Sequence, residues 1–322
     1  MKLSILDLAH VPAGMDVGHA LRNTLDLARR TDTLGYERYW LAEHHNMPGI
    51  ASAATSVVIG QVANVTQRMR IGAGGIMLPN HSPLVIAEQF GTLAALFPGR
   101  IDLGLGRAPG TDGLTWRALR RDAGAPDRFP DDVQELQALL GPVQPGQRIR
   151  AVPGADTNVP LWILGSSLFG SQLAGHLGLP YAFASHFAPA ALHGALRMYR
   201  ERFRPSAQLE RSYAMAGVNV VVAPTDDEAR HLFTSLQRVV VGIVTGARAQ
   251  LEPPAPLEPL SPPVAQQLEG FLGCSFVGSI DTVRAGLLQF SAETGVDELI
   301  VASAIHDHEA RVRSYELLAR LI

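Results

Sequence analysis

The sequence predicts an α/β protein, a (β/α)8 TIM barrel with an insertion between the seventh and eighth strands. Along most of the 322 residues, short apolar runs alternate with segments of helical periodicity, as in parallel strands joined by crossover helices. Eight such pairs are present, and the chain length is typical of this barrel. A doubly wound protein of two domains would need a boundary, and no linker interrupts residues 1–240. We therefore expect residues 1–322 to form a single domain.

The expected strands are short apolar runs bounded by glycine, proline or polar residues. They cover Leu3–Leu8, Tyr39–Ala42, Arg70–Gly74, Ile101–Gly106, Leu161–Gly165, Tyr181–Ala184, Val218–Val222 and Asp297–Ala302.

The helices expected between these strands carry apolar stripes and end signals. Val17–Leu34 is closed by Gly35, and Ser82 followed by Pro83 predicts the start of a helix that runs through Leu96. The other helices expected with defined positions are Ala53–Ala63, a polar helix near Asp131–Leu140 and a final helix that ends at Leu321.

Residues 242–278 interrupt this alternation and form the predicted insertion. Six prolines lie between Pro253 and Pro263, a density that we expect to exclude helix and central strand. A lid over the barrel and a mobile surface loop are both consistent with this composition.

Composition excludes several classes of protein. Lys and Arg number 27 and Asp and Glu 30, for a formal charge of −3, which argues against nucleic acid as a partner. The single cysteine, Cys274, excludes an internal disulfide and a zinc site of several thiolates. No apolar run reaches the roughly 18 residues of a membrane span, and the N-terminus has the pattern of a strand rather than a signal peptide. We expect a cytoplasmic protein without a membrane partner.

In a parallel barrel the chemistry lies where strands end, and the second strand ends at Glu43, His44 and His45. Histidine suits proton transfer near neutral pH. Neighbours in an extended chain point to opposite sides, so His44 and His45 are not expected to bind one ion. Glu43 and His45 could share a side, but no third ligand follows at an interpretable spacing. We therefore predict no metal site.

Two further strand ends suit a flat, phosphorylated ligand. Gly74 and Gly75, after the third strand, allow either close approach of a flat ligand or a bulge that tightens the barrel. Arg107, after the fourth, has the planar donor fork that suits a phosphate, although it could equally pair with a barrel carboxylate.

The fifth and sixth strand ends complete the predicted site. The fifth strand runs into a helix whose N-terminal hydroxyls and free amides suit an anion, a role compatible with ordinary N-capping. A histidine follows the sixth strand. The residues concerned are Gly165, Ser166, Ser167, Gly170, Ser171 and His186. Five strand ends together thus predict one site for a flat, phosphorylated cofactor.

Four motifs in order carry a resemblance to a known family. They are WLAEHHN (Trp40–Asn46), IGAGGIMLPNHSP (Ile71–Pro83), IAEQFGTLAALFPGRIDLGLGRAPG (Ile86–Gly110), and LGSS and LGLPYAFASHF within Leu164–Phe187. Together they resemble the bacterial luciferase-like flavin-dependent monooxygenases, most closely the homodimeric, alkanal monooxygenase-type branch. The resemblance covers nearly the whole chain.

The resemblance implies a barrel that binds reduced FMN (FMNH2), supplied by a separate flavin reductase, and activates O2 as co-substrate. His44 matches the catalytic histidine of the family. Gly74 and Gly75 match the pair joined by a non-proline cis peptide beneath the flavin ring. Arg107 matches the phosphate-binding arginine. The phosphate-proximal turn is matched by Ser166, Ser167, Gly170 and Ser171.

Two positions depart from the family pattern. The reactive cysteine of the light-emitting enzymes falls on Gly106, which argues against light emission. A second phosphate-binding arginine falls near Asp131, where Arg128 is the available replacement.

These observations together predict a flavin-dependent monooxygenase, an oxidoreductase that uses FMNH2 and O2 on a small, largely apolar substrate, aldehyde-like or aromatic. The alternatives are a deazaflavin (F420)-dependent hydride-transfer enzyme and a non-catalytic flavin-binding protein; His44 argues against the latter, because storage needs no proton-transfer residue. We expect His45 to serve structure by hydrogen-bonding between loops. The family implies a homodimer, and the small-residue stretch Ala51–Ile59 would permit close helix approach.

Overall fold

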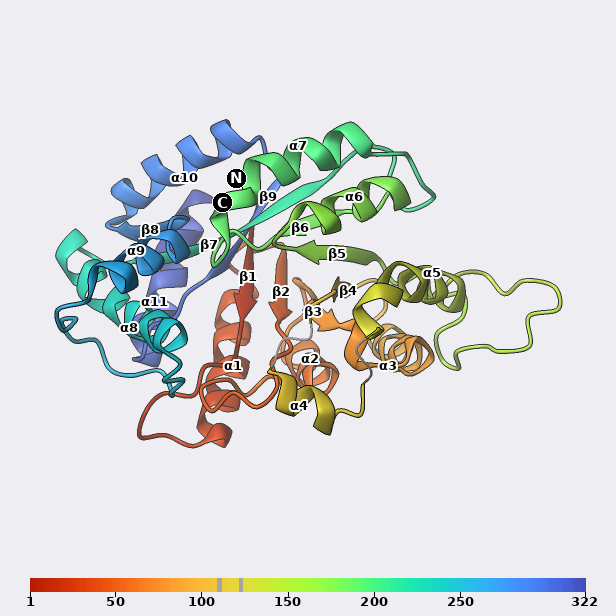
Figure 1. The fold of residues 1–322 in the computed structure, drawn as a ribbon, viewed down its shortest axis with the longest axis horizontal. Helices are drawn as coiled ribbons and strands as arrows, with labels where there is room; N and C mark the ends of the chain where they lie inside the picture. The colour runs from red at the N-terminus through yellow and green to blue at the C-terminus, as the bar shows by residue number, and fades with distance from the viewer. Residues whose placement is uncertain (109–111, 122–123) are drawn as a thin grey trace.

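The computed structural model describes residues 1–108, 112–121 and 124–322, and it forms a closed barrel of parallel strands (Figure 1). The ring consists of β1 (Leu3–Asp7), β2 (Arg38–Leu41), β3 (Arg70–Met77), β4 (Ile101–Gly106), β5 (Leu161–Gly165), β6 (Tyr181–Phe183), β7 (Ala214–Val222) and β9 (Glu298–Ala302). Pairing of β6 with β7, and of β9 with both β7 and β1, closes the ring. The predicted (β/α)8 barrel is confirmed.

Helices surround the strands and cover the outside of the barrel (Figure 1). They are α1 (Val17–Thr31), α2 (Thr55–Asn64), α3 (Pro83–Leu96), α4 (Gly113–Ala118), α5 (Phe129–Leu140), α6 (Leu168–Leu177), α7 (Leu192–Arg202), α8 (Asp226–Thr245), α9 (Pro262–Phe271), α10 (Ile280–Thr294) and α11 (His308–Leu318). The long connection 141–160 between α5 and β5 extends away from the barrel (Figure 1). Among the described residues, no helix has the length and apolar character needed to cross a membrane.

Local chemistry explains where the early elements start and stop. Asp16 caps α1 by accepting a hydrogen bond from the backbone N–H of His19, and Gly35 reverses the chain afterwards with φ +97°. Pro83 occupies the first turn of α3, where its missing N–H costs no helical hydrogen bond. Ser82 stands at the N-cap position, as predicted, but its side chain makes no capping bond.

The insertion lies between the seventh and eighth ring strands, as predicted, but part of it is regular structure. α8 continues to Thr245, α9 begins at Pro262, and β8 (Ser275–Gly278) pairs with β7 outside the ring. The expectation that this segment holds no helix is therefore wrong. Proline is unfavourable inside a helix but fits its first turn, which is where Pro262 and Pro263 stand.

The insertion also contacts the loop that follows β1. The N–H of Leu251 donates to the carbonyl of Val11 at 2.9 Å, and the N–H of Ala13 donates to the carbonyl of Leu251 at 2.7 Å. This short ladder fixes the insertion beside the carboxyl ends of the strands.

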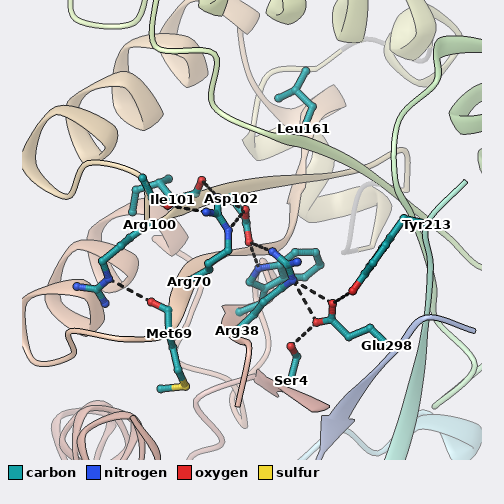
Figure 2. A network of polar contacts seen from close by, with 12 residues as sticks. Ser4, Arg38, Met69, Arg70, Arg100, Ile101, Asp102, Leu161, Tyr213 and Glu298 are labelled. Atoms are coloured by element: carbon teal, nitrogen blue, oxygen red, sulfur yellow. Dashed lines mark hydrogen bonds and ion pairs between the residues drawn. The ribbon is translucent and has the colours of Figure 1, made fainter. Parts of the chain in front are cut away.

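The opposite end of the barrel is filled by a buried network of charges (Figure 2). Arg38 lies between Asp102, at 2.7 Å, and Glu298, at 3.1 Å. Arg70 reaches the other oxygen of Asp102 at 2.6 Å, and the hydroxyl of Tyr213 donates to Glu298 at 2.8 Å. Since both carboxylates are buried and paired, this end of the barrel is a structural floor. Ligand chemistry is left to the other end.

Candidate functional site

The parallel ring brings the predicted residues to one end of the barrel. His44 follows β2, Gly74 and Gly75 lie within β3, Arg107 follows β4 and Ser166 follows β5. His186 comes shortly after β6. Because all ring strands point the same way, these positions share the carboxyl-end mouth.

The Glu43 side chain hydrogen-bonds to four residues at this mouth. Its Oε1 lies 2.7 Å from Nε2 of His45, and both of its oxygens lie 2.9 Å from Nε2 of His81. Its Oε2 also accepts the backbone N–H of Met77 at 2.9 Å, and its Oε1 accepts from the Asn80 side-chain amide at 3.2 Å. Burial alone would raise the pKa of Glu43, but these hydrogen bonds, led by His45 and His81, hold that pKa at about 2. Glu43 is therefore ionised throughout the neutral range.

The sequence did not predict His81 as a partner of Glu43. It stands beyond the end of β3, and a 3-10 turn, Leu78–Asn80, folds it back toward the end of β2. Glu43, His45 and His81 each offer one atom that could ligate a metal ion, and these three atoms lie within 4.8 Å of one another. This spacing raises the question of a bound cation. Hydrogen bonds already engage both carboxylate oxygens and both imidazole Nε2 atoms, so we assign a hydrogen-bonded cluster.

His44 and His45 have different neighbours: His45 bonds to Glu43, whereas His44 interacts with His10 and His186. Its Nδ1 is buried and has no hydrogen-bond partner among the described residues. Burial lowers the pKa of His44, an effect that the nearby Glu43 carboxylate only partly offsets. His44 is thus a neutral imidazole at neutral pH, with one ring nitrogen unpaired within the described part of the chain.

Two further histidines lie close to His44. The pKa values of His10, after β1, and of His186 are lowered to about 4, mainly by burial. Arg311 also lowers the pKa of His10, and the charge of His44 contributes to both decreases. The His186 ring fills space left by Gly217, where an added Cβ would lie 2.3 Å from Nδ1 of His186. His10 was not predicted, although its position just after the first strand was a signal of the same kind that singled out His44.

Gly74 and Gly75 are joined by a non-proline cis peptide bond, as the resemblance implied. Neither position has room for a side chain: a Cβ on Gly75 would lie 2.6 Å from the carbonyl oxygen of Gly104, and one on Gly74 would lie 2.9 Å from Leu6. The N–H of Glu43 donates to the carbonyl of Gly75 at 3.2 Å. The backbone of this turn is therefore bare and is held directly by the end of β2.

Arg107 meets the N-terminus of α6 at the mouth. Its guanidinium lies 4.1 Å from the ring centroid of Phe169, in the first turn of α6. Ser167, at the N-cap position, makes no side-chain capping bond, and both Ser166 and Ser167 are exposed. The Arg107 guanidinium and the free backbone N–H groups of α6 thus lie at the same place, an arrangement that suits a phosphate.

The remaining residues of the predicted turn are placed inside the fold. Gly165 and Gly170 approach closely, since a Cβ on Gly165 would lie 3.5 Å from the Cα of Gly170. Ser171 is buried, and its hydroxyl donates to the carbonyl of Leu168 at 2.7 Å. These three residues shape the turn, while Ser166 and Ser167 face solvent.

The two departures from the family pattern have defined places. A Cβ on Gly106 would lie 2.8 Å from Sδ of Met77, so a larger side chain there would displace that methionine. Arg128 directly precedes α5, and Asp131 is exposed in its first turn.

Comparison with known proteins places the chain in a family. The sequence profile described as "Luciferase-like monooxygenase" matches residues 1–298. The chain belongs to this luciferase-like monooxygenase family. It is 52% identical over 317 residues to a protein named "Luciferase-like monooxygenase" from Escherichia coli (strain K12), covering 98% of this chain and 95% of that one. It is 31% identical to the N-acetyl-S-alkylcysteine monooxygenase of Bacillus subtilis (strain 168), covering 99% and 97% of the two chains.

Solved structures show the same fold. The crystal structure of apo-MsnO8 has a TM-score of 0.92 and 36% identity and covers 99% of this chain and 98% of its own. The oxygenating constituent of 3,6-diketocamphane monooxygenase, in complex with FMN, has a TM-score of 0.77 at 15% identity and covers 99% and 97% of the two chains. An F420-dependent secondary alcohol dehydrogenase has a TM-score of 0.73 at 14% identity and covers 100% and 98%. The fold alone thus accompanies both flavin and deazaflavin chemistry.

Proposed function

We propose that this family member is an FMN-dependent monooxygenase that uses FMNH2 and O2 to oxidise a small, largely apolar organic substrate. One observation carries the proposal: the Arg107 guanidinium and the uncapped start of α6 share the barrel mouth with the bare Gly74–Gly75 turn and the unpaired imidazole of His44. An anion site, a surface without side chains and a neutral proton carrier are the three features that a flavin mononucleotide site needs.

The residues fit FMN on chemical grounds. A guanidinium stays charged at all relevant pH values and donates two parallel hydrogen bonds to a phosphate. Free backbone amides at the start of α6 add donors aligned with the helix dipole. When bound, FMNH2 supplies the electrons with which one oxygen atom of O2 enters the substrate and the other leaves as water.

The chain's own residues bind, orient and exchange a proton. Arg107 and Ser166 hold the phosphate end, and the Gly74–Gly75 backbone, which carries no side chain of its own, is where we place the flat ring. The Nδ1 atom of His44 is where we place proton exchange, because it is buried and unpaired among the described residues. His186 lines the same mouth and stays uncharged at neutral pH, since its pKa is about 4.

The proposed partners are a separate flavin reductase, which provides FMNH2, and a second copy of this chain. For the substrate we propose an aldehyde-like or aromatic compound, and the name of the Bacillus subtilis relative adds thioethers to the classes worth testing.

The test begins with the cofactor. Purified protein is incubated with FMN and, in parallel, with F420, and the absorption spectrum that survives gel filtration is recorded. We expect FMN to be retained. Retention of F420 alone would replace the proposal with deazaflavin-dependent hydride transfer.

Turnover is then measured with NADH, O2 and a flavin reductase against panels of aldehydes, aromatics and thioethers. We expect NADH consumption to be coupled to an oxygenated product for at least one class. Hydrogen peroxide as the sole product with every compound would support the non-catalytic alternative.

A further inference from the structure

Glu43 connects two strand ends through both its backbone and its side chain. Its N–H donates to the carbonyl of Gly75, and its carboxylate accepts the N–H of Met77 and the side chains of Asn80 and His81. The whole segment from Gly75 to His81 is thus tied to one residue at the end of β2. The next residue along the chain from Glu43 is His44.

We infer that Glu43 is a positioning residue that sets His44 against the Gly74–Gly75 turn, and that one of its imidazole partners, His45, makes this coupling depend on pH. The inference deepens the proposed function and rests on it for its catalytic consequence. The hydrogen-bonded cluster itself is a property of the protein alone.

Burial separates the roles within the cluster. The Glu43 side chain is 1% exposed, so its oxygens depend on protein donors. The side chain of His45 is 19% exposed, so its imidazole can exchange a proton with solvent. Proton exchange at the rim therefore changes the strength of the bonds to a buried carboxylate, which keeps its own charge.

The direction of the pH effect follows from the charges that face the cluster. His45 faces Glu43 and, more weakly, His44, and the exposed Arg248 of the insertion also acts on His44. The hydrogen bond to Glu43 raises the pKa of His45 above its ordinary value. A protonated His45 donates a charge-assisted bond, and as the pH rises through this raised pKa the charge assistance is lost. The coupling is thus strongest on the acid side of that pKa.

The experiment compares Glu43→Gln with Glu298→Gln. Both glutamates are buried and hydrogen-bonded, but Glu298 lies in the floor network at the far end of the barrel (Figure 2). With FMN bound and reductase present, we expect Glu43→Gln to lower kcat for product at least tenfold, with more peroxide and a flattened pH profile. Glu298→Gln should lower the melting temperature and leave kcat per folded molecule and the pH profile unchanged. Equal behaviour of the two variants would overturn the inference.

A second measurement needs no flavin. Imidazole NMR titration should show a raised pKa for His45 in the natural protein and in Glu298→Gln, and its return toward the ordinary range in Glu43→Gln. His81→Gln, which keeps a side-chain donor at a partly exposed position, guards against a Glu43 variant that does not fold, and it should shift the titration of His45. An ordinary pKa for His45 in the natural protein would overturn the inference. If the protein binds no flavin but the pKa of His45 is raised, the proposed function is overturned and the hydrogen-bonded cluster is still supported.

Discussion

At the scale of single residues, His44 is the group whose removal separates chemistry from binding. Its imidazole is neutral and unpaired at Nδ1, and no described residue hydrogen-bonds that atom. We predict that His44→Ala keeps FMN affinity and melting temperature and loses product formation by roughly 10²-fold or more. Because burial lowers the pKa of His44, product formation in the natural protein should persist somewhat below pH 6.5, the ordinary histidine pKa.

The neighbouring histidine is the control for that prediction. His45 hydrogen-bonds to the Glu43 side chain, so His45→Ala should mainly lower the melting temperature. An unstable His44→Ala that still couples NADH to product would show that the roles of the two residues are reversed. Coupled turnover and thermal unfolding, measured on both variants, decide between these outcomes.

Arg107 carries the phosphate assignment. Charge-assisted hydrogen bonds contribute roughly 1.5–3 kcal/mol each. Arg107→Ala should therefore weaken FMN by about ten- to a hundredfold without unfolding the protein, since the side chain is exposed and rests on Phe169. Riboflavin, which lacks the phosphate, should bind both proteins alike. Fluorescence titration with the two flavins measures this, and unchanged FMN affinity would refute the assignment.

Single residues also show what strand ends reveal in a sequence and what they hide. His44 and Arg107 could be found because each stands within three residues of the end of a strand, and topology alone then places it at the mouth. His81 could not, because a 3-10 turn beyond β3 brings it to Glu43, and that contact spans 38 residues. His10 carried the same signal as His44, but a lone histidine in a loop, without a second polar residue beside it, does not by itself indicate a site.

At the scale of elements, the ring strands were predictable because buried parallel strands are apolar throughout. The predicted strand boundaries were wrong where glycine and alanine weaken the apolar pattern. β3 continues past Gly74 to Met77, and β7 already starts at Ala214. At Pro262 the error was a helix that the sequence analysis excluded. Proline disrupts a helix in its interior but is tolerated in its first turn, where Pro262 stands.

The buried ion pairs of the floor network connect several strands, and their loss should affect stability alone. Arg38 is shared by Asp102 and Glu298, and Arg38→Met would remove the guanidinium that pairs with Glu298 and leave Asp102 with Arg70 alone. Breaking a buried ion pair costs about 3–5 kcal/mol. We predict a loss of this order in urea unfolding, with FMN affinity of the folded fraction unchanged, because the mouth lies at the other end of the strands. A loss within error of zero would show that the pairs are dispensable.

At the scale of the whole molecule, two neighbouring helices share an outer face that carries exposed apolar side chains and almost no charge. α2 contains no charged residue, α3 contains only Glu88, and the two helices pack against each other. Val57 is 66% exposed, Val85 46% and Leu96 65%. Surface helices ordinarily carry charged outer faces, so exposed apolar side chains on two adjacent helices favour an interaction site here. The stretch Ala51–Ile59, predicted from its small residues, leads into this face.

We predict that this face joins two copies of the chain about a two-fold axis. Light scattering at micromolar concentration should give twice the 34.5 kDa of one chain. In an isologous interface each substitution occurs twice, so Val57→Glu combined with Leu96→Glu should place four buried carboxylates between the copies and yield monomers. Leu288→Glu is the matched control, because Leu288 is 55% exposed on α10, which lies across the barrel from α2 and α3 (Figure 1). A monomeric natural protein, or a double variant that stays dimeric, would exclude this face as the interface.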